Sequence, residues 1–202
     1  MKATIDRKLA QAGTTLVLLL CASALSAQAV PAAPTKHTTD IAFTYTAERA
    51  NSVGSGDSWL QGGSVEAGID IWRGLALAGN LTSTHTSSIG QQNVPLSLLV
   101  YTFGPRYRWT LPGGKGKQTS VFGEAMVGGV RGFDSLFPTN SGSTSPRASA
   151  LAVQISAGID VQLKHHFDLR PAEISWVRMQ LPNSTSNTQN DLRISAGIVL
   201  RY

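Results

Sequence analysis

The segment SALAVQISAGIDVQL, from Ser149 to Leu163, is the clearest indication of the fold in this 202-residue chain. Its apolar and polar side chains occupy alternate positions, which is the pattern of a β-strand with one apolar and one polar face. A helix is excluded, because its apolar residues would recur at every third and fourth position. The stretch exceeds the roughly 5 to 6 residues of most soluble strands and fits a tilted strand that crosses about 30 Å of hydrocarbon.

The same alternation recurs along the chain and defines eight segments. They are Asp40–Glu48, Trp59–Ile71, Gly74–Thr84, Leu96–Trp109, Thr119–Arg131, Ser149–Leu163, Phe167–Leu181 and Asp191–Tyr202. Pro171 interrupts the alternation of the seventh segment, so we expect a bulge or a late start there, because proline cannot donate to a sheet ladder. The sequence predicts an all-β fold, an eight-stranded antiparallel up-and-down transmembrane β-barrel.

The gaps between these segments alternate in length. Long gaps rich in Ser, Asn, Gly and Thr follow the odd-numbered segments, at Arg49–Ser58, His85–Pro95, Gly132–Ala148 and Pro182–Asn190. The gaps after the even-numbered segments are shorter, and one consists of Trp72 and Arg73 alone. Outer-membrane barrels have long external loops and short periplasmic turns, whereas a soluble sandwich has no reason for this asymmetry.

The N-terminus has the features of a secretory signal. Basic residues between Lys2 and Lys8 precede a short apolar stretch, and Ala27-Gln28-Ala29 matches a cleavage site. We expect residues 1–29 to be removed as a signal peptide, residues 30–38 to form a linker, and residues 39–202 to form the barrel. Removal would take away the one cysteine of the chain and lower the formal charge from +5 to +3.

The overall composition agrees with a membrane barrel. Charged residues make up 14% of the chain, against about 25% in ordinary soluble domains. The basic residues are scattered along the sequence and form no cluster, so we expect no nucleic-acid partner.

The last segment ends on an aromatic residue. Ile194, Ile198, Leu200 and Tyr202 share its apolar face. An alternating last strand with an aromatic end looks like the signal that the outer-membrane barrel assembly machinery recognises. We therefore expect that machinery to be a partner of this chain.

Four segments carry a resemblance to a known family: Phe103–Tyr107, Gly158–Val161, Leu169–Pro171 and Asn190–Tyr202. With them the chain resembles small outer-membrane β-barrel proteins of the OmpA-like transmembrane type, above all those common in acidobacteria. The likeness covers most of the chain after the signal. Because no peptidoglycan-binding domain follows the last strand, the resemblance implies a free-standing barrel.

The predicted inward faces carry four acidic and four basic side chains. A charge on the lipid face costs about 2–4 kcal/mol near the bilayer midplane, and a buried unpaired charge is also penalised. Eight strands leave an interior just wide enough for side chains. We therefore expect a structural salt-bridge network, with an ion gate or pore lining as the alternative. Its members are Glu66, Asp70, Arg106, Arg108, Glu124, Asp160, Arg193 and Arg201.

No motif predicts catalysis, a cofactor or a metal. His85 and Ser87 could mimic a base and nucleophile, as in lipid-modifying outer-membrane enzymes, but no nearby carboxylate orients the histidine. His165 and His166 lie in a short turn without further zinc ligands. We expect no catalytic, cofactor-binding or metal-binding residue.

The expected function is a structural or surface-interaction scaffold that displays four external loops. Its partners would be outer-membrane lipids and an extracellular partner that the sequence does not identify. The longest loop, Gly132–Ala148, offers Phe133, Leu136 and Phe137 as contact candidates. The alternatives are a narrow conduit for ions or small hydrophobic molecules, a lipid-modifying enzyme and a soluble lipocalin-like carrier.

Overall fold

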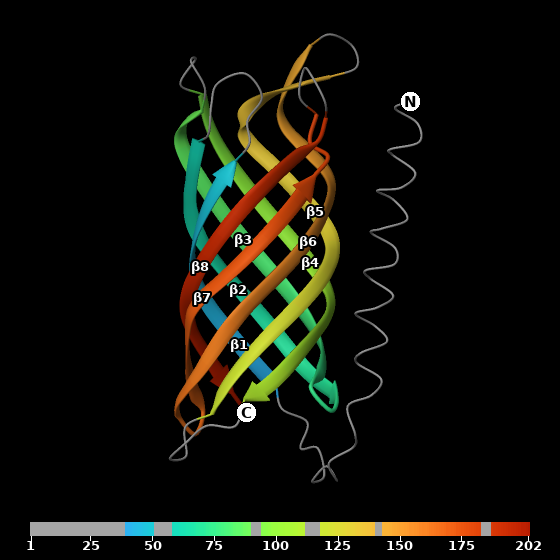
Figure 1. Cartoon of the computed structure of the whole chain (residues 1–202). Helices are drawn as coiled ribbons and strands as arrows, with labels where there is room; N and C mark the ends of the chain where they lie inside the picture. Colours follow the sequence, from blue (N-terminus) through green and yellow to red (C-terminus); the bar gives the residue numbers. More distant parts are fainter. Residues whose placement is uncertain (1–38, 51–57, 90–93, 112–117, 140–142, 183–186) are drawn as a thin grey trace, which may run out of the picture. The chain divides into compact units, whose positions relative to one another are not determined.

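Eight antiparallel strands close into a single barrel, in which each strand pairs with its neighbours in the sequence and β8 pairs with β1 (Figure 1). The computed structural model describes residues 39–50, 58–89, 94–111, 118–139, 143–182 and 187–202. The predicted fold is thereby confirmed. The strands are β1 (Thr39–Ala50), β2 (Ser58–Trp72), β3 (Leu75–Ile89), β4 (Val94–Leu111), β5 (Thr119–Pro138), β6 (Thr144–Lys164), β7 (Phe167–Met179) and β8 (Gln189–Arg201).

The expected signal peptide and linker lie outside the described residues. Among the residues that are described, the structure contains no helix long and apolar enough to cross a membrane.

The two ends of the barrel differ. At one end, called here the turn end, the first and last residues of the barrel meet, because Thr39 and Tyr202 exchange backbone hydrogen bonds of 2.9 Å. The tight turn between β2 and β3 lies at the same end, where Arg73 (φ 43°) and Gly74 (φ 87°) provide the two positive φ angles of a two-residue hairpin turn. The opposite end, between β1 and β2 and between β5 and β6, is called the loop end.

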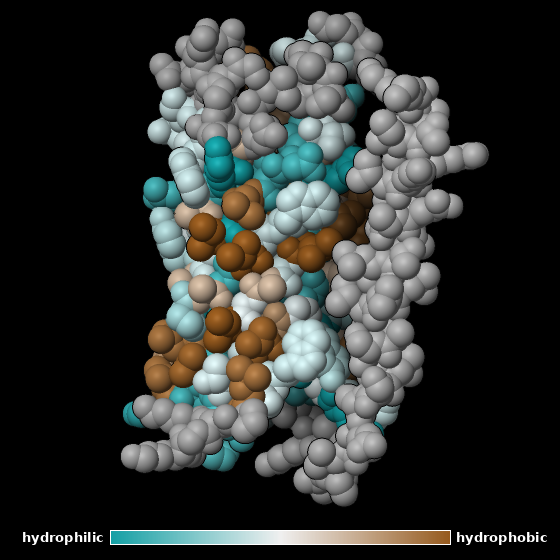
Figure 2. Space-filling view, viewed as in Figure 1, coloured by the Kyte–Doolittle hydropathy of each residue, from teal (hydrophilic) through white to brown (hydrophobic). Residues whose placement is uncertain are grey.

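The outer face of the barrel is apolar along most of its length. Large hydrophobic side chains are exposed at every second residue of the strands, and Figure 2 shows them gathered over the middle and lower part of one side. A closed barrel with an apolar outer band is the form in which β-strands cross a bilayer, because every backbone polar group of the strands is paired.

Several strands extend beyond the predicted segments. β3 continues to Ile89 and β4 starts at Val94, so most of the predicted loop His85–Pro95 is strand. The predicted loop Gly132–Ala148 is likewise mostly the paired ends of β5 and β6. The prediction stopped where the apolar alternation stops, whereas backbone pairing needs no apolar side chain once a partner strand runs alongside.

Of the bulge or late start expected at Pro171, the structure shows a bulge. Arg170 pairs with Gly197 and Glu173 pairs with Ser195, so Pro171 and Ala172 of β7 lie opposite the single residue Ala196 of β8. Pro171 and Ala172 both face outward. The inward parity of β7 therefore shifts by one residue at this point, and both Arg170 and Glu173 point into the barrel.

The interior near the loop end contains an apolar cluster, which the sequence analysis did not predict, beside the buried side chains of Glu48, Arg193 and Asp191. The cluster consists of Ala50, Leu60, Leu98, Val100, Val130, Phe137, Ala152, Val177, Met179 and Leu181. Phe137, expected on an exposed loop, belongs to this cluster and is only 7% exposed. Its ring occupies the space beside Gly132, where any side chain would meet it. The prediction that Phe137 is a surface contact residue is therefore wrong.

Candidate functional site

Charged side chains fill the interior on the turn-end side of the apolar cluster, and two buried arginines organise them. Arg106 on β4 is fully buried and reaches carboxylates of three strands. Its Nη1 donates to Asp40 of β1 at 2.8 Å, and its Nε donates to Glu124 of β5 at 3.2 Å. Its Nη2 also pairs with Glu66 of β2. One guanidinium thus joins four strands.

Arg170 on β7 is the second centre. Its Nε donates to Asp160 at 2.8 Å, and its Nη1 donates to Glu66 and Glu173 at 2.9 Å each. The bulge makes the Glu173 contact possible, since a regular strand would turn a side chain three positions away to the opposite face. Both arginines also lie over the ring of Phe122, at 4.2 Å for Arg170 and 5.4 Å for Arg106.

Two further arginines extend the network to the turn end. Arg108 pairs with Asp40, and with Asp70 at 3.3 Å. Arg201 pairs with Asp160 at 3.1 Å and with Asp168 at 2.8 Å. Because Asp40, Glu66 and Asp160 each serve two arginines, all these contacts form one connected network.

The structure brings seven of the eight predicted inward charges into this network. The eighth, Arg193, lies apart and pairs with Glu48 at 3.0 Å; Thr84 donates to the same carboxylate at 2.9 Å. Sequence reasoning missed the buried Asp191 of β8. It also missed Asp40, Glu48, Asp168, Arg170 and Glu173. The first two share the inward parity of Ala42 and could have been found by that signal. The last three lie on β7, where Pro171 obscured the parity.

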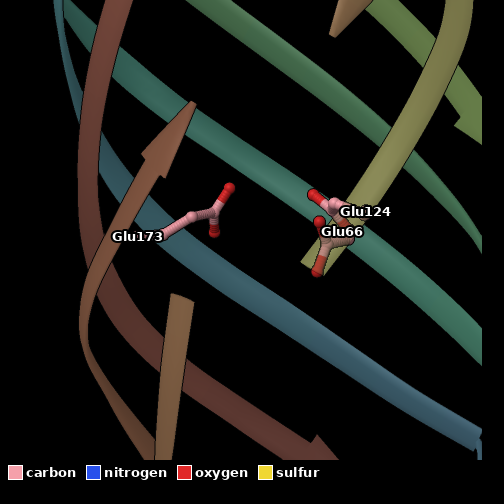
Figure 3. A group of neighbouring side chains, drawn as sticks. All are labelled: Glu66, Glu124 and Glu173. Carbon is pink, nitrogen blue, oxygen red and sulfur yellow. The ribbon is translucent and has the colours of Figure 1, made fainter. Parts of the chain in front are cut away.

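Three glutamates form the most acidic part of the interior. One carboxylate oxygen from each of Glu66, Glu124 and Glu173 lies within 4.8 Å of the others. Figure 3 shows Glu173 pointing from β7 toward Glu66 and Glu124 on the facing side. Such oxygens could hold a cation, but Arg106 and Arg170 already donate to them. The cluster is therefore the acceptor part of an arginine network.

A chain of polar contacts on the outer surface involves His85 without Ser87. His85 Nδ1 lies 2.9 Å from Ser97 Oγ, and Ser97 donates to Asp134 Oδ2 at 2.8 Å. In a hydrolytic triad the histidine stands between the serine and the carboxylate. Here the serine occupies the middle position, donates a hydrogen bond to Asp134 and is 7% exposed. The geometry suits a link between β3, β4 and β5 and does not provide an activated nucleophile.

The other predicted residues lie on the outer face. Ile194 and Tyr202 are exposed, whereas Ile198 and Leu200 are half-buried on the same face of β8. The Tyr202 ring stacks on His166 with 5.7 Å between centroids. Near the loop end, Leu136 is 63% exposed and Phe133 is half-buried.

No family model matches the sequence, and no curated protein matches it. Solved structures do share the fold. Neisserial surface protein A is 15% identical, with a TM-score of 0.59 over 83% of this chain and 100% of that chain. The attachment invasion locus protein Ail of Yersinia pestis is 12% identical, with a TM-score of 0.51 over 83% and 100%. OprG, an outer membrane protein of Pseudomonas aeruginosa, is 9% identical, with a TM-score of 0.51 over 83% and 97%. The fold is thus that of small eight-stranded outer-membrane barrels.

Proposed function

We propose that this protein is exported by its N-terminal signal and resides in the bacterial outer membrane as a non-enzymatic scaffold with a closed interior. The proposal rests on the distribution of side chains in the closed barrel, which is the reverse of that in a soluble protein. Apolar residues cover the outside, and charged residues pair within. Acyl chains are the natural surrounding for such an outer face. A soluble lipocalin-like carrier would need the opposite arrangement, with an apolar cavity and a polar exterior.

The filled interior argues against the conduit alternative. The arginine network occupies the turn-end side, and the apolar cluster around Leu60, Leu98 and Val130 occupies the loop end. An ion that passed through would have to displace paired charges of the network and then pass the apolar cluster, beside which Arg193 and Glu48 form a further buried pair. Displacing buried paired charges is costly. We therefore assign the interior a structural role.

Planar-bilayer recording tests this assignment. The purified mature chain should insert and give no stable single-channel conductance. The paired substitution Leu60→Ser and Leu98→Ser should introduce hydroxyls into the apolar cluster and raise the frequency of openings, while Leu77→Ser on the outer face serves as the control. A large, stable conductance of the unmodified chain would contradict the closed-interior proposal.

We also propose that the β5–β6 hairpin projects from the cell and is the surface for an extracellular partner, with Leu136 as its exposed apolar residue. The mature chain would contain no cysteine, so a single Leu136→Cys substitution gives a unique reactive site. A membrane-impermeant maleimide should label it on intact cells, whereas Lys164→Cys at the turn end should react only after the outer membrane is opened. Labelling of Lys164→Cys alone on intact cells would reverse the proposed orientation.

A further inference from the structure

In the part of the chain that the structure describes, the charged side chains inside the barrel are mostly acidic, and those outside are mostly basic. Among the described residues, the interior holds nine acidic and five basic side chains: Asp40, Glu48, Glu66, Asp70, Glu124, Asp160, Asp168, Glu173, Asp191, Arg106, Arg108, Arg170, Arg193 and Arg201. The remaining charged residues of the described part face outward or lie in turns, and six of these seven are basic: Arg49, Arg73, Arg131, Arg147, Lys164, Arg178 and Asp134. The few charges that the described residues place on the apolar outside are therefore almost all positive.

Two of these outward arginines share a groove. It has a volume of about 520 Å³ and is lined by residues of β4, β5 and β6 near the loop end, among them Leu99, Arg131, Phe133 and Arg147. Arg147 pairs with Phe133 across the ladder, and Arg131 is the next outward residue of β5. Diagonal neighbours of this kind lie roughly 7–8 Å apart, so both guanidinium groups can reach one small anion.

Both arginines are available for such an anion. Both are exposed, and neither guanidinium has a hydrogen-bond or ion-pair partner among the residues that the structure describes. The one acid of the groove, Asp134, already accepts a hydrogen bond from Ser97 at 2.8 Å. Arginine offers a planar fork of donors that matches phosphate oxygens.

The residues next to the groove indicate which kind of molecule would present the phosphate. On β4, Leu99 lies in the groove, and the next outward-facing residues toward the middle of the barrel are the exposed Tyr101 and Phe103. On β6, the exposed Leu151 is the next outward-facing residue after Ser149. An apolar surface therefore runs from the groove toward the middle of the barrel. Arginine side chains at such a boundary lay their methylene stems on the apolar surface and extend their charge to the headgroups.

We propose that this groove binds the phosphate-bearing headgroup of an anionic lipid in the leaflet at the loop end. Arg131 and Arg147 hold the phosphate, and the acyl chains lie along Leu99, Tyr101 and Leu151. The inference rests on the membrane location proposed above, and it adds a specific lipid class as ligand.

Native mass spectrometry of the chain, released from vesicles of equimolar phosphatidylcholine and phosphatidic acid with identical acyl chains, tests the proposal. The unmodified protein should retain phosphatidic acid in preference by about tenfold, since both lipids offer phosphate oxygens to the arginines but only phosphatidic acid has no choline ammonium to offset the phosphate charge. The double variant Arg131→Gln/Arg147→Gln should reduce this preference to within about twofold. Arg178→Gln, which removes an outward arginine that lies outside the groove, should leave it unchanged.

The outcomes separate the possible failures. The assignment to this groove is overturned if the preference for phosphatidic acid persists in the double variant. It is also overturned if Arg178→Gln abolishes the preference as fully as the double variant does. Displacement of the retained lipid by inorganic phosphate alone would show that the groove takes free phosphate, and would overturn the lipid assignment. Heat-modifiable migration on gels confirms that each variant is folded. If the unmodified chain fails to enter vesicles at all, the proposed membrane location fails; entry without lipid preference overturns the present proposal alone.

Discussion

Replacement of Arg170 by methionine removes the centre of the interior network while keeping a side chain of similar length. The guanidinium of Arg170 is almost fully buried, at 1% exposure, and contacts Asp160, Glu66 and Glu173. The consequences for the three carboxylates differ, because some of them have a second arginine partner.

After the substitution, Asp160 keeps its contact with Arg201, and Glu66 keeps its contact with Arg106. Glu173 loses its ion pair with Arg170 and keeps the hydrogen bond that the Ser175 hydroxyl donates at 3.2 Å. The substitution thus leaves about one uncompensated buried charge, and a broken buried pair costs about 3–5 kcal/mol. We expect the free energy of unfolding to fall by that amount.

Urea unfolding in phospholipid vesicles, followed by the fluorescence of the tryptophans, measures the change. Arg178→Met is the matched control on the same strand, since Arg178 is exposed on the outer face, and its effect should stay within about 0.5 kcal/mol. In the double variant Arg170→Met/Glu173→Gln the orphaned charge is absent, so it should regain about 1–3 kcal/mol over Arg170→Met. The reasoning is refuted if Arg170→Met unfolds within about 1 kcal/mol of the unmodified protein, or if the double variant regains nothing.

Three further outcomes are expected. Gly158→Ala places a Cβ 2.5 Å from the ring of Phe122 and should cost about 1–3 kcal/mol of unfolding free energy, whereas Gly123→Ala, where the nearest atom is 3.8 Å away, should cost less; equal costs in urea unfolding would contradict this packing. Tyr202→Ala should slow membrane assembly in cells, seen as a delayed gel shift in pulse-chase, and normal kinetics would exclude an assembly role for this residue. Ser97→Ala removes the hydrogen bond to Asp134 on the β5–β6 hairpin, together with the contact to His85 on β3, and should speed proteolysis of the hairpin without altering the gel shift; unchanged cleavage would show that the link to Asp134 does not hold the hairpin.

The fold could be predicted from the sequence because an apolar outer face and a charged interior require the same alternation on every strand. The segment Ser149–Leu163 lies wholly within β6, and the inward placement of Glu66 and Asp160 follows from parity alone. Where the outer face is no longer regularly apolar, the alternation carries no signal. For this reason the sequence predicts a loop at the ends of β5 and β6.

Two features of the interior could not be derived from alternation. The bulge at Pro171 was expected, but the choice between a bulge and a late start depends on pairing with β8, which lies far away in the sequence. The apolar cluster near the loop end has the same inward parity as the charged residues. Leu98 and Val100 give the fourth strand two apolar faces there, and this is the signal that could have revealed it.

The interior charges contribute to the register and closure of the barrel as well as to its stability. In a membrane the apolar outer face is compatible with any arrangement of strands that exposes it to lipid, so it does little to select one closed barrel. A slip of one residue in register would turn Arg106 or Glu66 toward acyl chains, at about 2–4 kcal/mol near the midplane for an arginine. The arginines also connect strands that are not neighbours, since Arg106 joins β4 to β1 and β2, and Arg170 joins β7 to β2. These contacts cross the interior of the closed barrel. The network therefore stabilises the closed barrel and the correct register together, whereas the apolar outer face determines only which medium surrounds the barrel.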